Sequence, residues 1–284
     1  MQIINGKYYA DQILADIKLE VENLRRQNIH PALTIVLVGN NQASAIYVAN
    51  KMKRAEEVGI KATLIHLPEE TSQETIIAKI QRLSLDSLIH GIIVQLPIPK
   101  HIDKNIIQQA INPMKDVDGL HPLNVGMLHS DIKDALIPCT PQGCMHLLKI
   151  VCSNLSGKLA VVIGRSSIVG KPMSALLTQE NATVIMAHSK TQNLQDLTSK
   201  ADIVISATGM PLFLKRHHFK KGAIVLDVGI SRMDDQSIVG DVDFEDVKDM
   251  GLAALSPVPG GIGPMTIAYL LSNVVKATKA LTSQ

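Results

Sequence analysis

Two residues suited to acid–base catalysis, Tyr47 and Lys51, are four positions apart in the sequence. In a helix they share one face, because residues i and i+4 are neighbours there. Removal from water lowers the pKa of a lysine, which can then act as an acid or a base. The tyrosine can hydrogen-bond the amine or pack on a planar substrate. The alternative is a solvated lysine on a surface helix that also carries Lys53 and Arg54.

Further polar residues that could take part in such chemistry occur at two places, one after a short apolar run and one before a glycine. Gln95 comes directly after the predicted strand Gly91–Val94, where a neutral amide can orient a lysine without ionising. The alternative is an ordinary loop residue. Asp116 and Asp118 flank one valine before Gly119. Paired carboxylates indicate acid–base work, but aspartates are also common in turns, so both interpretations stay open.

The segment Leu159–Pro172 has the pattern of a strand, a glycine-bounded turn and a helix start. Such a turn binds a pyrophosphate, because free backbone N–H groups and the helix dipole face it. The pattern here is G-x-S-x-x-x-G, formed by Gly164, Ser166 and Gly170. It differs from G-x-G-x-x-G, so an ordinary strand–helix turn is the alternative.

The next predicted strand, residues 182–187, favours NADP over NAD as the cofactor. An acidic residue at the end of this strand would bind the ribose 2′-hydroxyl of NAD, whereas a basic residue accommodates the 2′-phosphate of NADP. The strand ends in His188-Ser189-Lys190-Thr191, without an acid. Arg165, inside the turn, can direct a guanidinium at a phosphate.

The composition is that of a globular protein and excludes several function classes. Of the 284 residues, 46% are hydrophobic and 19% charged, and no apolar run approaches the length of a membrane span. The net charge of +2 and the absence of tryptophan give no drive toward nucleic acid. The histidines lack metal-ligand spacing, so we expect no metal site. Cys139, Cys144 and Cys152 are expected to be reduced thiols, packed rather than catalytic.

Alternating strands and helices predict an α/β fold with parallel sheets. The first half has strands at 33–38, 61–67 and 91–94, separated by helices. Loops at the carboxyl ends of such strands line a cleft. A segment rich in proline and glycine, Asn112–Gly143, then leads to the strands of a Rossmann-type domain. A helix from Met265 to about Ala280 is expected to return to the first domain.

We therefore predict two domains. The first is an N-terminal βαβ parallel-sheet domain over residues 1–138, completed by the C-terminal helix at 265–284. The second is a Rossmann-type NADP-binding domain over residues 139–264.

The whole chain resembles the bifunctional methylenetetrahydrofolate dehydrogenase/methenyltetrahydrofolate cyclohydrolases. Eight segments occur in the order seen in that family, namely SAIYVANK, VQLPIP, PMKDVDGLHPLNVG, PCTPQG, VVIGRSSIVGKP, HSKT, DVGI and PVPGGIGPMT. One departure is Met127, where many members carry Arg or Lys. The resemblance implies NADP-dependent oxidation of 5,10-methylenetetrahydrofolate to the 5,10-methenyl compound, followed by hydrolysis to 10-formyltetrahydrofolate.

The resemblance also implies roles for individual residues. Lys51 would be the acid–base residue of the cyclohydrolase step, Gln95 would position it, and Tyr47 would pack on the folate. Asp118 would hold the pterin. Further substrate contacts would come from Leu96 and from Pro259, Gly260 and Gly261 in a loop that closes over the cleft. NADP would contact Gly164, Arg165, Ser166, Ser189 and Ile230. Family members are typically cytosolic homodimers that pair through the cofactor domains.

Two other functions are consistent with parts of the sequence. One is an NADP dehydrogenase of a hydroxy or amino acid, with its own acid–base residue and no cyclohydrolase activity. The other is a dinucleotide-sensing regulatory protein that uses its first domain to bind a partner. The combination of Lys51, Gln95 and Asp118 argues against both.

Overall fold

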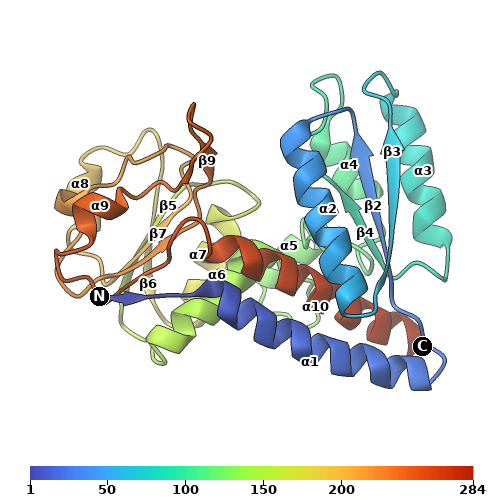
Figure 1. Ribbon diagram of the computed structural model, residues 1–284, viewed down its shortest axis with the longest axis horizontal. Helices are drawn as coiled ribbons and strands as arrows, with labels where there is room; N and C mark the ends of the chain where they lie inside the picture. Colours follow the sequence, from blue (N-terminus) through green and yellow to red (C-terminus); the bar gives the residue numbers. More distant parts are fainter. Residues whose placement is uncertain (284) are drawn as a thin grey trace. The chain divides into compact units, whose positions relative to one another are not determined.

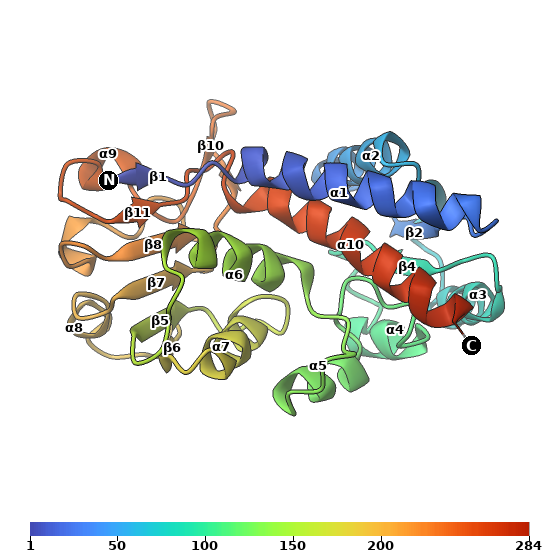
Figure 2. The ribbon, with the colours of Figure 1, turned by 90° about the horizontal axis from the view of Figure 1, so that it is seen from below.

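The computed structural model describes residues 1–283 (Figures 1 and 2), which divide into two compact units. Unit 1 comprises Met1–Ala10 and Thr140–Thr266. Unit 2 comprises Asp11–Cys139 and the C-terminal segment from Ile267 onward, so the C-terminal helix returns to the first domain as predicted. The predicted ranges differ from these units chiefly at the start, where the first ten residues join unit 1.

Unit 2 is built on a three-stranded parallel sheet. Its strands are β2 (Ala32–Val38), β3 (Lys61–Leu67) and β4 (Gly91–Val94), in the order β3-β2-β4. The central strand β2 is buried over almost its whole length, as expected for a parallel sheet covered on both faces. The carboxyl ends of β2 and β4 therefore lie at the same edge, where Gln95 follows β4.

Helices cover both faces of the unit 2 sheet. Figure 1 shows α2 (Gln42–Glu57) and α3 (Gln73–Leu85) on opposite sides of it. Isoleucines of α3 and of α4 (Lys104–Ala110) pack on valines of β2 and β4 to form one core. A short helix, α5 (Pro122–His129), follows. Three longer helices have residues in both units, namely α1 (Gly6–Arg26), α6 (Cys139–Val151) and α10 (Ile262–Thr282).

Unit 1 contains a six-stranded parallel sheet in the order β1-β11-β8-β7-β5-β6. Its strands are β1 (Gln2–Ile3), β5 (Leu159–Ile163), β6 (Thr183–Ala187), β7 (Ile203–Ser206), β8 (Ile224–Asp227) and β11 (Ala254–Leu255). The chain runs from β5 outward to β6 and then crosses back to β7. The strand order thus reverses between β5 and β7, which is where open α/β sheets bind ligands.

The helices of unit 1 are mostly short. Figure 2 shows α7 (Gly170–Gln179, yellow) beside β5 and β6, which it contacts. The other helical segments are α8 (Leu194–Thr198), η1 (Arg216–His218) and α9 (Phe244–Val247). A core of β5, β7, β8 and β11 side chains packs against Phe219 and Val247. Two further strands, β9 (Ser231–Arg232) and β10 (Ile238–Val239), form an antiparallel hairpin.

Neither a membrane span nor a metal cluster is present in residues 1–283. No helix in this range is long and apolar enough to cross a bilayer. No group of three or more His, Cys, Asp or Glu side chains in it is placed to hold a metal ion.

Candidate active site

Lys51 and Gln95 form a buried pair in unit 2. Lys51 Nζ donates a hydrogen bond of 3.0 Å to Gln95 Oε1. The two side chains are only 4% and 8% exposed. The solvated-lysine alternative is therefore wrong, because the amine is held out of bulk water against a neutral acceptor.

The backbone of both elements fixes this pair. Helix α2 begins after Asn41, whose side chain accepts a hydrogen bond from Ser44 N and so caps the helix. Gln95 N donates to Val36 O across the sheet, and Gln95 Nε2 donates to Leu96 O at 2.7 Å. Because the amide nitrogen is engaged by Leu96, its oxygen is left to face Lys51.

Tyr47 lies one helical turn before Lys51 and is half-buried. Lys51 Nζ lies 4.9 Å from the centre of the Tyr47 ring, within the range of a cation–π contact. The structure thus brings together the tyrosine, lysine and glutamine singled out from the sequence.

Asp116 is a structural residue of the turn that follows. It is 2% exposed, and its Oδ2 accepts hydrogen bonds from His121 N (2.7 Å) and Asn124 Nδ2 (2.9 Å). Burial raises the pKa of Asp116 to about 6, these hydrogen bonds oppose the shift, and the charge of Asp118 adds to it. The contacts agree with the turn-forming interpretation for this aspartate.

Asp118 has a different environment, which it shares with Lys51. It is half-buried and precedes Gly119, whose φ of 71° lies in the left-handed region. Burial raises the pKa of the Cys139 thiol well above its ordinary value; the charge of Asp118 adds to this shift and that of Lys51 opposes it. Both charges therefore act on one buried thiol.

Sequence reasoning missed the position of Cys139 in this group. Cys139 and Cys144 are buried, as expected for packed thiols, and all three cysteines are free. Cys139 Sγ donates to Val117 O at 3.2 Å, next to Asp118. The signal that could have placed it is the PCTPQG segment, which the family resemblance includes.

In unit 1, the turn between β5 and α7 has room only for glycine at two positions. A Cβ atom at Gly170 would lie 2.0 Å from the carbonyl oxygen of Gly164. One at Gly164 would lie 2.5 Å from that of Ala207, after β7. Arg165 and Ser166 are exposed in this turn, and Ser166 Oγ accepts a hydrogen bond from Val169 N. These residues fit a dinucleotide, whose pyrophosphate can approach the bare backbone.

The end of β6 lies beside this turn. Ile163 pairs with Ala187, and Gly164 N donates to Ala187 O at 2.8 Å. Because the ends of β5 and β6 are paired, the exposed Ser189, two residues after β6, lies near the turn that contains Arg165. No acidic residue follows β6 before Thr191, which agrees with NADP rather than NAD.

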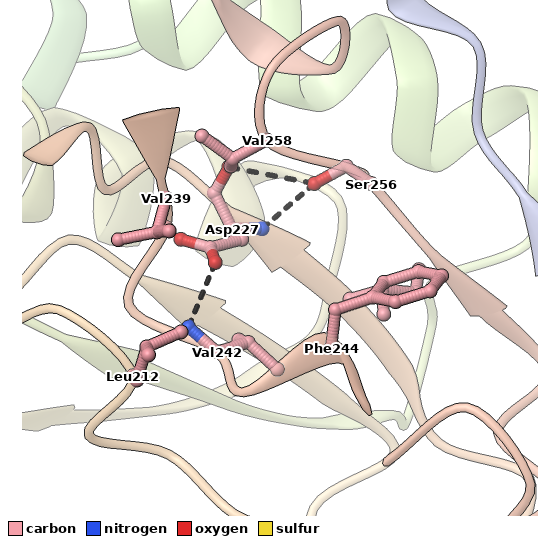
Figure 3. Close-up of a pocket in the computed structure, with 9 residues that line it drawn as sticks. Leu212, Asp227, Val239, Val242, Phe244, Ser256 and Val258 are labelled. Atoms are coloured by element: carbon pink, nitrogen blue, oxygen red, sulfur yellow. Dashed lines mark hydrogen bonds between the residues drawn. The ribbon is translucent and has the colours of Figure 1, made fainter. Parts of the chain in front are cut away.

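Ile230 and the Pro257–Gly261 loop lie at the same edge, after β8 and β11. Asp227 holds the backbone between β8 and Ile230, because its Oδ1 accepts from Gly229 N and Asp241 N, and its Oδ2 from Val242 N. Figure 3 shows this carboxyl group in a small pocket with Ser256 and Val258. Ile230 itself is 62% exposed, so it is free to contact a ligand. Gly260 O accepts a hydrogen bond from Lys7 N.

These features define the class of protein. A six-stranded parallel sheet with a glycine-bounded turn at its switch point is a dinucleotide-binding domain. Unit 2 supplies a buried lysine that is hydrogen-bonded to a neutral amide, an arrangement suited to acid–base chemistry.

Comparison with known proteins identifies the family. A model for the tetrahydrofolate dehydrogenase/cyclohydrolase catalytic domain matches residues 4–118, and one for the NAD(P)-binding domain of the same enzymes matches residues 138–282. The chain belongs to the tetrahydrofolate dehydrogenase/cyclohydrolase family.

Individual relatives agree over the full length. A protein of Rickettsia bellii named Bifunctional protein FolD is 55% identical over 278 residues, which are 98% of each chain. The structure of a bifunctional FolD enzyme of Campylobacter jejuni has 45% identity and a TM-score of 0.96 and covers 99% of each chain. The Trypanosoma brucei enzyme, solved with NADP and an inhibitor, has 36% identity and a TM-score of 0.94. The match covers 99% of this chain and 98% of the Trypanosoma brucei chain.

The predicted family, α/β fold, bifunctional enzyme class and NADP cofactor are therefore confirmed. The roles assigned to individual residues stay predictions.

Proposed function

We propose that this protein carries out two consecutive reactions of one-carbon folate metabolism, with Lys51 as the acid–base residue of the second. It oxidises 5,10-methylenetetrahydrofolate to 5,10-methenyltetrahydrofolate with NADP⁺, and it hydrolyses that cation to 10-formyltetrahydrofolate. The observation that carries the role of Lys51 is its buried 3.0 Å hydrogen bond to Gln95.

Lys51 moves protons in the hydrolytic step. Water adds to the methenyl carbon, and the neutral amine takes a proton from the attacking water. The resulting ammonium returns a proton to N5 of the folate as the carbon–N5 bond breaks. The hydroxyl group on the same carbon releases its proton to solvent as the C=O bond forms, which leaves a formyl group on N10. The sum is one water consumed and one proton released. Gln95 accepts a hydrogen bond from the amine in both protonation states, so it orients Lys51 without adding a competing charge.

The dehydrogenase step requires mainly alignment of the two bound rings. NADP⁺ supplies the chemistry by accepting the hydride. Gly164 and Ser166 would hold the pyrophosphate, Arg165 and Ser189 the 2′-phosphate, and Ile230 the nicotinamide end.

Asp118 is assigned to the pterin ring. A reduced pterin presents adjacent N–H donors, and a carboxylate can accept two of them side by side. Tyr47 provides a ring on which the folate can pack. Contacts of Leu96, Pro259, Gly260 and Gly261 with the substrate are proposed on the family resemblance alone.

We also propose a cytoplasmic homodimer that pairs through unit 1. The family resemblance supports both points, and the three free thiols agree with a reducing compartment. Light scattering of the purified protein tests the dimer, because a monomer mass at micromolar concentration would contradict it.

Following both chromophores tests the two activities together. The protein is mixed with 5,10-methylenetetrahydrofolate and NADP⁺, and the absorbances of NADPH and of the methenyl compound are recorded. We expect NADPH and 10-formyltetrahydrofolate to form. Failure to form NADPH, or methenyl product that hydrolyses only at the rate without enzyme, would contradict the proposal.

A further inference from the structure

One polar side chain of the C-terminal helix is buried among apolar ones. Asn273 on α10 is 3% exposed, and its neighbours Leu271, Val274 and Val275 are buried too. A primary amide in such a place is costly unless its hydrogen bonds are made. The hydrogen bonds of the Asn273 amide therefore indicate its structural role.

Asn273 joins two backbone segments that are distant in the sequence. Its Nδ2 donates to Val117 O and to Ile137 O, both at 2.9 Å. The Val117 carbonyl belongs to the peptide that leads into Asp118, and it also accepts the Cys139 thiol at 3.2 Å. Two donors on one carbonyl oxygen fix the orientation of that peptide plane.

The two joined segments also press against each other beyond Asp118. A Cβ atom at Gly119 would lie 2.5 Å from the carbonyl carbon of Ile137 and 2.6 Å from the oxygen of Leu136. The backbone is therefore held on both sides of Asp118, by Asn273 before it and by close packing of Gly119 after it. Little freedom is left for the carboxylate to change its position.

We propose that Asn273 is a positioning residue for folate binding, which fixes the Asp118 carboxylate through the Val117 carbonyl. The inference rests on the proposed contact of Asp118 with the pterin. Asn273 itself touches neither substrate nor cofactor in this account. Replacing Asn273 should weaken folate binding equally in the ground state and in the transition state. KM for folate should therefore rise while kcat is largely kept.

The same helix offers a matched control. Lys276 Nζ donates to Lys133 O at 3.0 Å and Ala135 O at 2.7 Å, so it too ties α10 to the segment before Cys139. It makes no contact with the Val117–Gly119 turn in these hydrogen bonds. Lys276→Met thus removes a similar pair of bonds without reaching Asp118.

The test is a double-mutant cycle on the full-length enzyme. We expect Asn273→Ala to raise KM for folate by about tenfold in both activities, the equivalent of about 1.4 kcal/mol. KM for NADP should change less than about twofold, and Lys276→Met should leave both near wild type. In an Asp118→Ala background, adding Asn273→Ala should raise KM for folate no further, because the group it positions is absent.

Four results would overturn the inference. An unchanged KM for folate in Asn273→Ala would do so, and so would equal effects of Asn273→Ala and Lys276→Met. Additive effects on KM in the cycle would show that Asn273 acts independently of Asp118. If Asp118→Ala alone binds folate normally, the proposed role of Asp118 fails and the inference with it. If Asn273→Ala melts below the assay temperature, the cycle is run with Asn273→Ser, which keeps one donor.

Discussion

The amine of Lys51 and the amide oxygen of Gln95, 44 residues apart in the sequence, lie 3.0 Å from each other in a buried site. A helix and a strand end meet there, and the amide is oriented by its own bond to Leu96 O. A neutral acceptor of this kind positions the amine without placing a second charge beside it.

Replacing that acceptor by a carboxylate should impair hydrolysis. In Gln95→Glu, the buried negative charge would stabilise the ammonium form of Lys51. Cyclohydrolase activity at neutral pH should fall by about 10²-fold, the usual scale for an acid–base group. Part of it should return at higher pH. Hydrolysis of the methenyl compound across a pH series checks this, and a pH profile that superimposes on the wild-type profile would contradict it.

Asp118 and Asp116 should respond differently to replacement by alanine. Asp118→Ala should raise KM for folate and depress both activities together, because both reactions use the same bound ring. Its NADP affinity should be nearly unchanged. Asp116→Ala removes an acceptor from His121 N and Asn124 Nδ2, so it should lower the melting temperature instead. Kinetics and thermal melts of both variants decide; the opposite pattern would mean that the two roles are exchanged.

The buried carboxyl of Asp116 should make stability depend on pH. Its pKa is raised from 3.8 to about 6, so between these values the folded protein binds a proton that the unfolded chain has lost. The stabilisation is complete at pH below the unfolded value and is lost as pH rises through the folded one. The free energy of unfolding falls by about 3 kcal/mol over this pH range through Asp116. Asp227, whose pKa is raised to about 7, contributes with the same sign.

Asp116→Asn isolates this contribution, because an amide oxygen can accept the same two hydrogen bonds. The wild-type free energy of unfolding, minus that of Asp116→Asn, should fall between about pH 4 and pH 6 and then level off. Urea unfolding at several pH values measures it. A difference that is independent of pH would show that Asp116 does not titrate in this way.

Arg165 should determine cofactor choice. One charge-assisted phosphate contact contributes about 1.5–3 kcal/mol to binding. Arg165→Ala should therefore weaken NADP binding by about 10- to 100-fold and affect NAD binding much less. Ratios of kcat/KM for the two cofactors measure the preference. If the variant loses NADP and NAD activity equally, the guanidinium does not read the 2′-phosphate.

The sequence predicts those parts of the fold whose signals are local. The strand Gly91–Val94 is observed as predicted because β-branched runs specify buried parallel strands. Strand β1 was not predicted, since it has two exposed residues and is defined only by pairing with β11. Helix α5 lies in the proline- and glycine-rich segment Asn112–Gly143, where no helix is predicted from the sequence, although Pro122 at its first turn is a helix-start signal.

The site follows the same division. Tyr47 and Lys51 share a helix face and Gln95 ends a strand, so their spacing made them candidates. The specific roles of these residues came from the family resemblance and stay predictions. Asn273 carried no signal, because its partner Val117 is 156 residues away and only tertiary packing brings them together. The separate roles of Asp116 and Asp118 likewise depend on burial, which an Asp-Val-Asp sequence does not show.

The most direct test of the central claim is the hydrolysis rate of Lys51→Met. Methionine keeps much of the lysine volume but removes the titrating amine. With purified 5,10-methenyltetrahydrofolate as substrate, cyclohydrolase activity should fall by at least about 10²-fold. Dehydrogenase activity should survive in part, so that the methenyl compound accumulates when the reaction starts from the methylene compound. Hydrolysis by Lys51→Met at the wild-type rate would remove this lysine from the mechanism.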